Sequence, residues 1–133
     1  MNAVADAPIY GRTYPQFVAF LREPGEVAPV LSAKKYIAAL AIDLQDLADQ
    51  ARVHRNTLSR APTSKAVQDY LRQALRVIKA AVDLNGDVYN ALFWFRNEPL
   101  APFDYKTAET LVADGRADDV VRFVTSLQGG AAG

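Results

Sequence analysis

The chain has 133 residues, of which 50% are hydrophobic and 23% are charged, and its formal net charge is zero. A chain of this length forms one domain, or two small domains that share a core. It contains no cysteine, which excludes a disulfide framework and a thiolate metal site and suits the reducing cytosol. No segment approaches the roughly 18 apolar residues of a membrane span, and the first residues lack the basic and apolar regions of a signal peptide. We therefore expect a cytoplasmic protein with no membrane association.

The charges are distributed unevenly along the chain. Residues 52–82 contain seven basic side chains and one acidic side chain, whereas residues 1–51 contain four and six, and residues 83–133 contain four and eight. A basic centre of this kind can bind phosphate groups without a basic overall charge. The alternative, for the last three basic residues of the centre, is that they form the solvated face of a long helix.

Helix-start and helix-stop signals follow one another along the whole chain. Ser32, Asp43 and Thr107 can each accept a hydrogen bond at the N-terminus of a helix. Gly86 and Gly115 suit the left-handed conformation that commonly ends one. The expected helices cover residues 14–21, 32–40, 43–51, 54–60, 64–85, 87–96, 107–115 and 116–127. Because the alternation of apolar and polar residues that marks a strand is nowhere sustained, the predicted fold class is all-α.

The middle of the chain has the residue spacing of a helix-turn-helix motif. Leu47, Ala48 and Ala51 are expected to face inward from the first helix, where small alanines allow two helices to cross closely. Val53 is expected to fill the turn, and Leu58 to anchor the second helix. The side chains left outside are of types that read base edges and bind phosphates in a major groove. The predicted DNA-binding residues are Arg52, His54, Arg55, Asn56, Thr57, Ser59 and Arg60.

The motif departs from its usual pattern at two positions. Arg52 occupies the place at which glycine commonly makes the turn, so the turn must either avoid positive φ or carry strain. Pro62 cuts the predicted recognition helix short. Both departures count against the standard docking geometry on DNA.

No combination of residues supports catalysis or metal binding. Residues 83–87 look like the start of an EF-hand, but such a loop requires glycine and glutamate where this chain has Val88 and Trp94. His54 has neither a second histidine nor a cysteine with which to share a metal. The acidic residues between positions 114 and 119 are explained by helix capping. We expect a protein that is not an enzyme and that needs no metal and no cofactor.

Two features near the C-terminus point to a partner. Phe93, Trp94 and Phe95 are consecutive, so on a helix at least one ring lies off the core face and meets a neighbouring helix or a partner. The alternative for Trp94 is plain core packing. After Gln128, the chain has no side chain larger than a methyl group. Such a tail is either a frayed terminus or a segment narrow enough to enter a cleft.

The order of elements in residues 91–130 resembles that of a known domain. A helix that carries Trp94 ends near Pro99, and a short connector with further prolines follows. Next come a helix capped by Thr107 and ending at Gly115, an acid-led helix and a Gly-Gly tail. This order is similar to that of the C-terminal toxin-binding domain of the Xre/MbcA/ParS antitoxins of bacterial type II toxin–antitoxin pairs.

The resemblance covers residues 83–133 and implies a partner. In this family the domain docks on a toxin that consumes NAD, a RES-domain or related ADP-ribosyltransferase-like enzyme, and its C-terminal end blocks the NAD-binding cleft. The upstream Xre-like module binds the promoter of its own operon and commonly dimerises. The toxin-binding residues that the resemblance implies here are Trp94, Arg96, Val120, Arg122, Phe123, Ser126, Leu127, Gln128, Gly129, Gly130, Ala131, Ala132 and Gly133.

These expectations divide the chain into three parts. Residues 1–30 are an N-terminal arm with a short helix, residues 31–82 an Xre-like helix-turn-helix module with a long connecting helix, and residues 83–133 a small helical toxin-binding domain. The predicted protein is an antitoxin, a homodimer that binds a cognate toxin and its own operator DNA. The alternative is a stand-alone helix-turn-helix transcription regulator whose C-terminal domain dimerises or senses a ligand.

Overall fold

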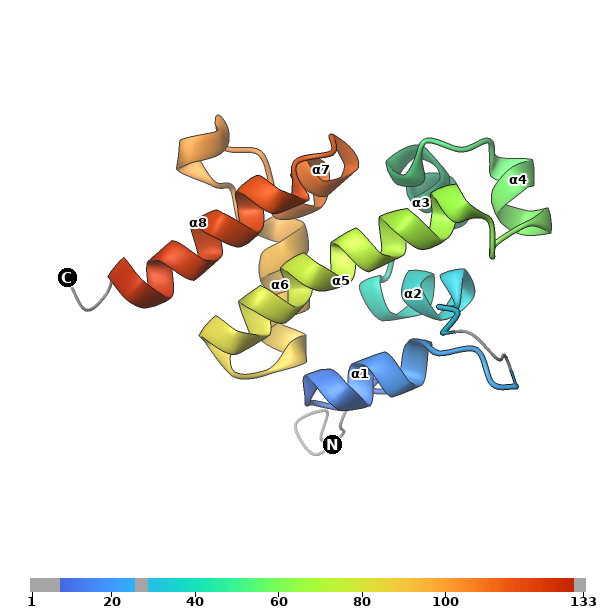
Figure 1. Ribbon diagram of the computed structural model, residues 1–133, viewed down its shortest axis with the longest axis horizontal. Helices are drawn as coiled ribbons and strands as arrows, with labels where there is room; N and C mark the ends of the chain where they lie inside the picture. Colours follow the sequence, from blue (N-terminus) through green and yellow to red (C-terminus); the bar gives the residue numbers. More distant parts are fainter. Residues whose placement is uncertain (1–7, 26–28, 131–133) are drawn as a thin grey trace, which may run out of the picture.

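The computed structural model, which describes residues 8–25 and 29–130, is built from helices (Figure 1). This confirms the all-α class, and two isolated antiparallel bridges are the only strand-like pairings between the described residues. The elements are α1 (Tyr14–Leu21), α2 (Ala33–Leu40), α3 (Leu44–Ala51), α4 (Arg55–Arg60), α5 (Lys65–Asn85), α6 (Val88–Asn97), the short 3-10 helix η2 (Ala101–Phe103), α7 (Ala108–Ala113) and α8 (Ala117–Gly130). None of the helices in the described ranges is both long and apolar enough to cross a membrane.

Most helix boundaries lie where the sequence placed them. Ser32, Asp43 and Thr107 each accept a hydrogen bond from the backbone N–H three residues later, as expected of N-caps. Gly86 (φ +93°) and Gly115 (φ +82°) adopt the left-handed conformation after α5 and α7. Local capping chemistry therefore explains where these helices begin or end.

The last helix extends further than the sequence predicted. We expected it to stop at Leu127, before a Gly-Gly tail, but α8 continues to Gly130. Glycine weakens a helix by about 1 kcal/mol relative to alanine without breaking it, and no proline follows to interrupt the hydrogen-bond ladder. The predicted end of this helix is therefore wrong by three residues, and the rest of the tail, residues 131–133, lies outside the described residues.

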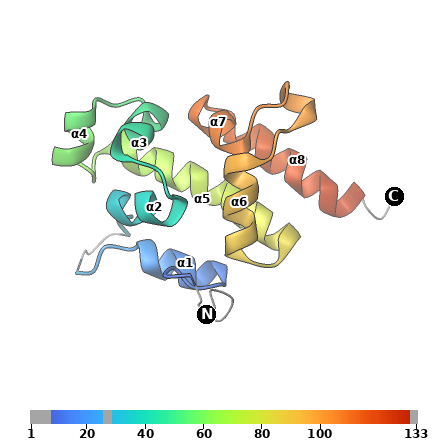
Figure 2. The ribbon, with the colours of Figure 1, turned by 180° about the vertical axis from the view of Figure 1, so that it is seen from behind.

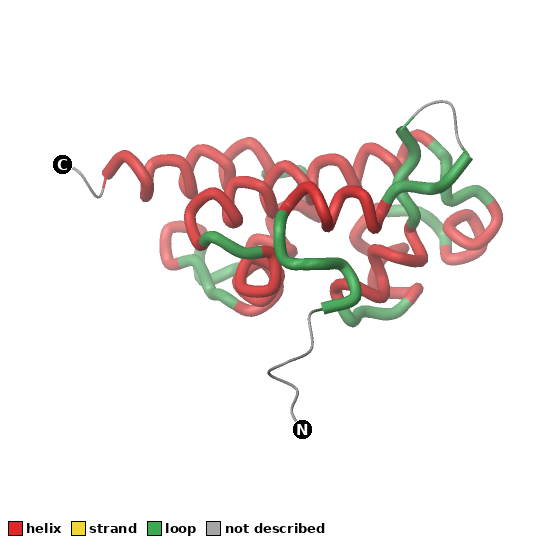
Figure 3. The backbone as a smooth tube through the Cα atoms, turned by 90° about the horizontal axis from the view of Figure 1, so that it is seen from below, coloured by secondary structure: helices red, strands yellow, loops and turns green. Residues whose placement is uncertain are grey.

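The α5 helix runs through the middle of the molecule and packs against α3, α6, α7 and α8 (Figures 1 and 2). Its 21 residues bury one face, on which Val67, Ala74, Val77 and Ile78 have no exposed surface. The α8 helix lies alongside it, also in the view from below (Figure 3). Buried side chains from every described α-helix form one continuous cluster, so these helices share a single core.

A buried glutamine ties the N-terminal segments to α5. Gln68 accepts a hydrogen bond from the backbone N–H of Leu31 (3.0 Å) and donates to the carbonyls of Leu31 (2.9 Å) and Pro62 (3.1 Å). Phe17 of α1 is wholly buried in the same cluster as the apolar face of α5. The helix predicted within residues 1–30 is therefore packed against the rest of the chain.

Gly115 provides a test of the helix boundary after α7. A Cβ atom at this position would meet nothing within 4 Å, so only the backbone conformation opposes a larger residue. We expect Gly115→Val to lower the free energy of unfolding by at least about 1 kcal/mol, because a β-branched residue is strained at positive φ. Urea denaturation measures the difference. Gly129→Ala, also in open space but within α8, is the matched control and should not destabilise; equal stability of the two variants would contradict the assigned cap.

Candidate nucleic-acid interface

The helix pair α3–α4 has the inward-facing residues that the sequence predicted. Leu47 and Ala48 have no exposed surface, and Ala51 and Leu58 are also buried. Val53, in the turn, is partly buried, and its backbone N–H donates to the carbonyl of Ala48 (3.0 Å). The prediction of the buried side of this pair is confirmed.

The opposite side of α4 is exposed to solvent. His54 caps the helix, since its Nδ1 accepts a hydrogen bond from the backbone N–H of Asn56 (3.1 Å). With six residues, α4 makes less than two turns. The exposed residues are His54, Arg55, Asn56, Thr57, Ser59 and Arg60. They are accessible to a ligand, and their binding of DNA stays a prediction.

Arg52 follows α3 in the left-handed conformation, with φ +57° and ψ +44°. This conformation costs a residue with a side chain roughly 1–2 kcal/mol. The guanidinium group turns to the end of α7, where Nε donates to the carbonyl of Ala113 (3.0 Å) and Nη2 lies 3.4 Å from the carboxylate of Asp114. Of the two outcomes expected for this turn, the structure therefore has the strained one. Arg52 is exposed like most residues of α4, but its guanidinium group already has partners within the chain.

Ion pairs within the chain neutralise much of its basic centre. Arg76 pairs with Asp118 of α8 (2.7 Å), and Lys79 pairs with Asp83 (3.0 Å). Arg72 pairs in the same way with an aspartate one turn earlier (2.9 Å). All three basic side chains are exposed, so the alternative of a solvated helix face is confirmed for them. The two arginines of α4, by contrast, form no ion pair with any described residue.

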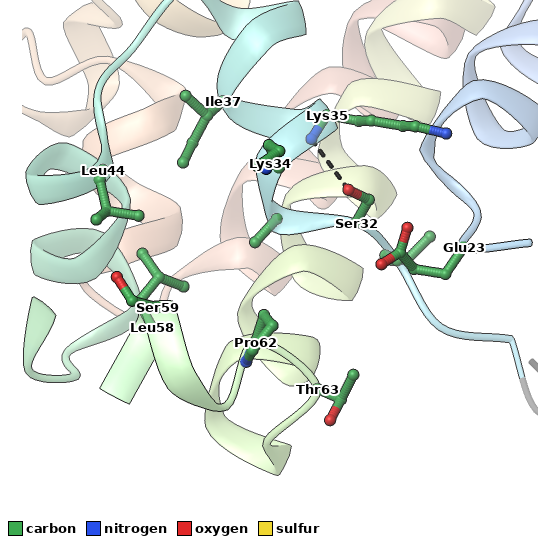
Figure 4. Close-up of a pocket in the computed structure, with 12 residues that line it drawn as sticks. Glu23, Ser32, Lys34, Lys35, Ile37, Leu44, Leu58, Ser59, Pro62 and Thr63 are labelled. Carbon is green, nitrogen blue, oxygen red and sulfur yellow. Dashed lines mark hydrogen bonds between the residues drawn. The ribbon is translucent and has the colours of Figure 1, made fainter. Parts of the chain in front are cut away.

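A groove of about 650 Å³ opens beside α4, between the first turn of α2 and the start of α3 (Figure 4). Apolar side chains of α2, α3 and α4 supply most of its surface, and Glu23, Lys34 and Lys35 add charges. Because the lining residues come from separate helices and loops, no local sequence pattern revealed the groove. Its size and lining suit a small molecule with a largely apolar body.

A partly buried polar cluster joins α6 to both α2 and α7, and α5 to α3. Arg96 of α6 donates from Nη1 to the carbonyl of Leu40 at the end of α2 (3.0 Å), and its Nε lies 3.3 Å from the carboxylate of Glu109 on α7. Burial raises the pKa of Glu109 above its ordinary value, although Arg96 opposes this shift. Nearby, the hydroxyl of Tyr70 donates to Gln50 of α3 (3.1 Å). No local sequence pattern predicted this cluster.

The residues predicted to bind a toxin do not form one exposed surface. Val120 has no exposed surface, because it belongs to the core between α8 and α5, so its assignment to a partner surface is wrong. Arg96 is engaged within the chain, and Trp94 and Phe123 are only partly exposed. The predicted residues that are exposed on α8 are Arg122, Ser126, Leu127, Gln128 and Gly129. Gly130 ends α8, and Ala131, Ala132 and Gly133 lie outside the described residues.

Comparisons of the chain with protein-family models, with curated proteins and with solved structures found no match. Among the described residues there is also no group of three or more potential metal ligands. A proposal for the function therefore depends on the candidate interface, on the charges and on the order of elements in the C-terminal part.

The raised pKa of Glu109 makes the stability of the fold depend on pH. A carboxyl group whose pKa is higher in the folded state stabilises that state in its neutral form. This contribution is fully present below pH 4.5, the ordinary pKa of the group. It is lost as the pH rises through the higher pKa of the folded state. In Glu109→Gln the group no longer titrates. We therefore expect the wild type to gain stability relative to this variant as the pH is lowered through that window.

Urea denaturation of both proteins, from about pH 8 down to about pH 4, measures this difference. Glu98→Gln, at an exposed glutamate beside the end of α6, is the control, because it removes one carboxylate and leaves Glu109 in place. Parallel stability curves for the wild type and Glu109→Gln would show that burial of this carboxyl group has no such effect.

Proposed function

We propose that the protein is the antitoxin of a type II toxin–antitoxin pair and has no enzymatic activity of its own. It would neutralise a cognate NAD-consuming toxin, RES-domain or ADP-ribosyltransferase-like, and repress its own operon as a homodimer on promoter DNA. The observation that carries the proposal is the order of elements in the C-terminal part. The helix α6 with Trp94, the connector with η2, the Thr107-capped α7 followed by Gly115, and the acid-led α8 follow in the order that the resemblance requires.

The geometry of α3 and α4 supports the DNA-binding part of the proposal. The buried residues of the pair leave Arg55, Asn56 and Arg60 exposed on α4. The donors of these side chains suit base edges and phosphate oxygens. Because no carboxylate of the described residues neutralises the two arginines, their charge is available to a phosphate backbone.

The end of α8 supports the toxin-binding part. Leu127 is 42% exposed, and Gln128 and Gly129 beside it are exposed as well. Two glycines make this last turn narrow and easy to unwind, since each weakens the helix by about 1 kcal/mol. We infer that the last turn of α8, with the residues that follow it, enters the NAD-binding cleft of the toxin.

The groove beside α4 favours a second candidate function, that of a stand-alone transcription regulator which senses a small molecule. A ligand in this groove would contact Leu58 and Ser59 and shift α4. The neighbouring reading frame distinguishes the two functions. A small RES-domain or ADP-ribosyltransferase-like protein there would support the antitoxin, and an unrelated metabolic gene would support the regulator.

Promoter binding should depend more on Arg55 than on Arg52. We expect Arg55→Ala to weaken binding to a promoter fragment by roughly 1–3 kcal/mol, the usual value for a side chain that reads a base. Arg52→Ala is the comparison variant and should have a smaller effect, because its guanidinium group already contacts Ala113 and Asp114. Fluorescence anisotropy with labelled promoter DNA measures both affinities, and circular dichroism checks folding. An unchanged affinity in Arg55→Ala would reject this role of α4.

Removal of residues 128–133 should separate docking from inhibition. The shortened protein keeps the buried Val120 and Val124 of α8, so it should fold and still bind its promoter. It should no longer block NAD consumption, because the segment proposed to fill the cleft is gone. NAD turnover by the co-purified toxin measures the effect. Removal of residues 131–133 alone shows whether the last turn of α8 takes part, and equal inhibition by all three forms would assign neutralisation to the globular helices.

A further inference from the structure

The α6 helix exposes a stripe of neutral side chains that neither proposed binding surface includes. Tyr89 is 58% exposed and Phe93 is 64% exposed, and with Asn97 they repeat every four residues along the helix. Phe95 is wholly buried, so the aromatic triplet is divided between core and surface, as the sequence predicted. Two exposed aromatic rings one turn apart are typical of a contact surface.

This stripe adjoins a hollow of about 210 Å³ on the same side of the molecule. Ala39 and Ala41, at the end of α2, line the hollow together with Leu92, and the exposed Tyr89 and Phe93 line it from α6. The surface thus combines projecting rings with a recess whose lining is mostly apolar and includes two alanines. Such a surface is self-complementary, since across a two-fold axis the ring of each copy can meet the recess of the other.

The charges of this surface fit a second copy of the chain better than they fit a nucleic acid. Among the described residues that line the hollow, Arg96 is the only charged one, and the Leu40 carbonyl and the Glu109 carboxylate hold its guanidinium group. A two-fold contact brings like residues close together, so a neutral surface avoids the repulsion that charged residues would cause. A nucleic acid, in contrast, requires cations that are available to its phosphates.

We propose that two copies of the chain associate through this surface of α2 and α6 into a two-fold homodimer. No exposed residue of α4 lines the hollow, so each copy keeps α4 accessible. Two α4 helices related by a two-fold axis match the symmetry of two half-sites in duplex DNA. The inference rests on the proposed function, for which it locates the dimer contact. Its test needs neither toxin nor DNA, so the inference and the proposed function can fail separately.

Sedimentation equilibrium of the full chain tests the surface. We expect Phe93→Ala to raise the dimer dissociation constant at least about 10-fold, and Phe93→Glu at least about 30-fold, as for a central aromatic side chain of an interface. Both variants should fold, because this ring is mostly exposed. Tyr105→Glu is the matched control, since Tyr105 is 70% exposed in the connector after η2 and does not line the hollow. Its dissociation constant should equal that of the wild type.

A thiol cross-link gives an independent measurement. The chain has no cysteine, so Asn97→Cys introduces a single thiol beside the proposed axis, and a short thiol-specific cross-linker should join two copies. Tyr105→Cys should give no such product. A wild type that stays monomeric at roughly millimolar concentration, or a dissociation constant unchanged by Phe93→Glu, would overturn the inference. Monomeric wild type whose toxin binding is lost in Phe93→Glu would assign this surface to the toxin instead.

Discussion

Burial of the apolar face of α5 is the interaction on which the other helices depend. Short helices are marginally stable alone in water, and most of their stability in a protein comes from the packing of one apolar face. The six-residue α4 is an extreme case, held to the core mainly through Leu58. The α3, α6, α7 and α8 helices all pack against α5. The candidate interface at one end of the molecule and the end of α8 at the other are therefore positioned by the same helix (Figure 1).

The partly buried polar cluster adds a second constraint, which concerns the arrangement of helices more than their stability. The ion pair of Arg96 with Glu109 contributes little net free energy, because desolvation of the largely buried carboxylate offsets much of the attraction. It nevertheless joins α6 to α7, and the bond to the Leu40 carbonyl joins α6 to the end of α2. Arg52, which follows α3, contacts the end of α7. These contacts connect α7, directly or through α6, to the helices that precede the candidate DNA-binding residues.

Local signals in the sequence predicted the helices well and failed where distant residues meet. The cap at Ser32 and the turn at Gly115 depend on neighbours within a few residues, so both were predictable. Val120 was assigned to a partner surface on resemblance alone, whereas its burial depends on the packing of α8 against α5. The contact of Arg52 spans 61 positions and that of Gln68 with the α1–α2 connection spans 37, and no local pattern encodes either. The exposed side of α4 was predictable, because the spacing of the buried residues along the sequence determines which side chains remain outside.

Ion pairs within the chain reduce the positive charge that its basic centre offers to a partner. Asp118 pairs with Arg76 and Asp114 with Arg52, so part of the acidic C-terminal flank neutralises the basic centre within one molecule. Under the proposed function, the two arginines of α4 then neutralise about two phosphates, which corresponds to a salt-dependence slope of only about −2. Such a single copy would bind DNA weakly. Two copies joined through α2 and α6, away from α4, double the number of phosphate contacts. The sparse charge of α4 is thus a physical reason why operator binding would require the dimer.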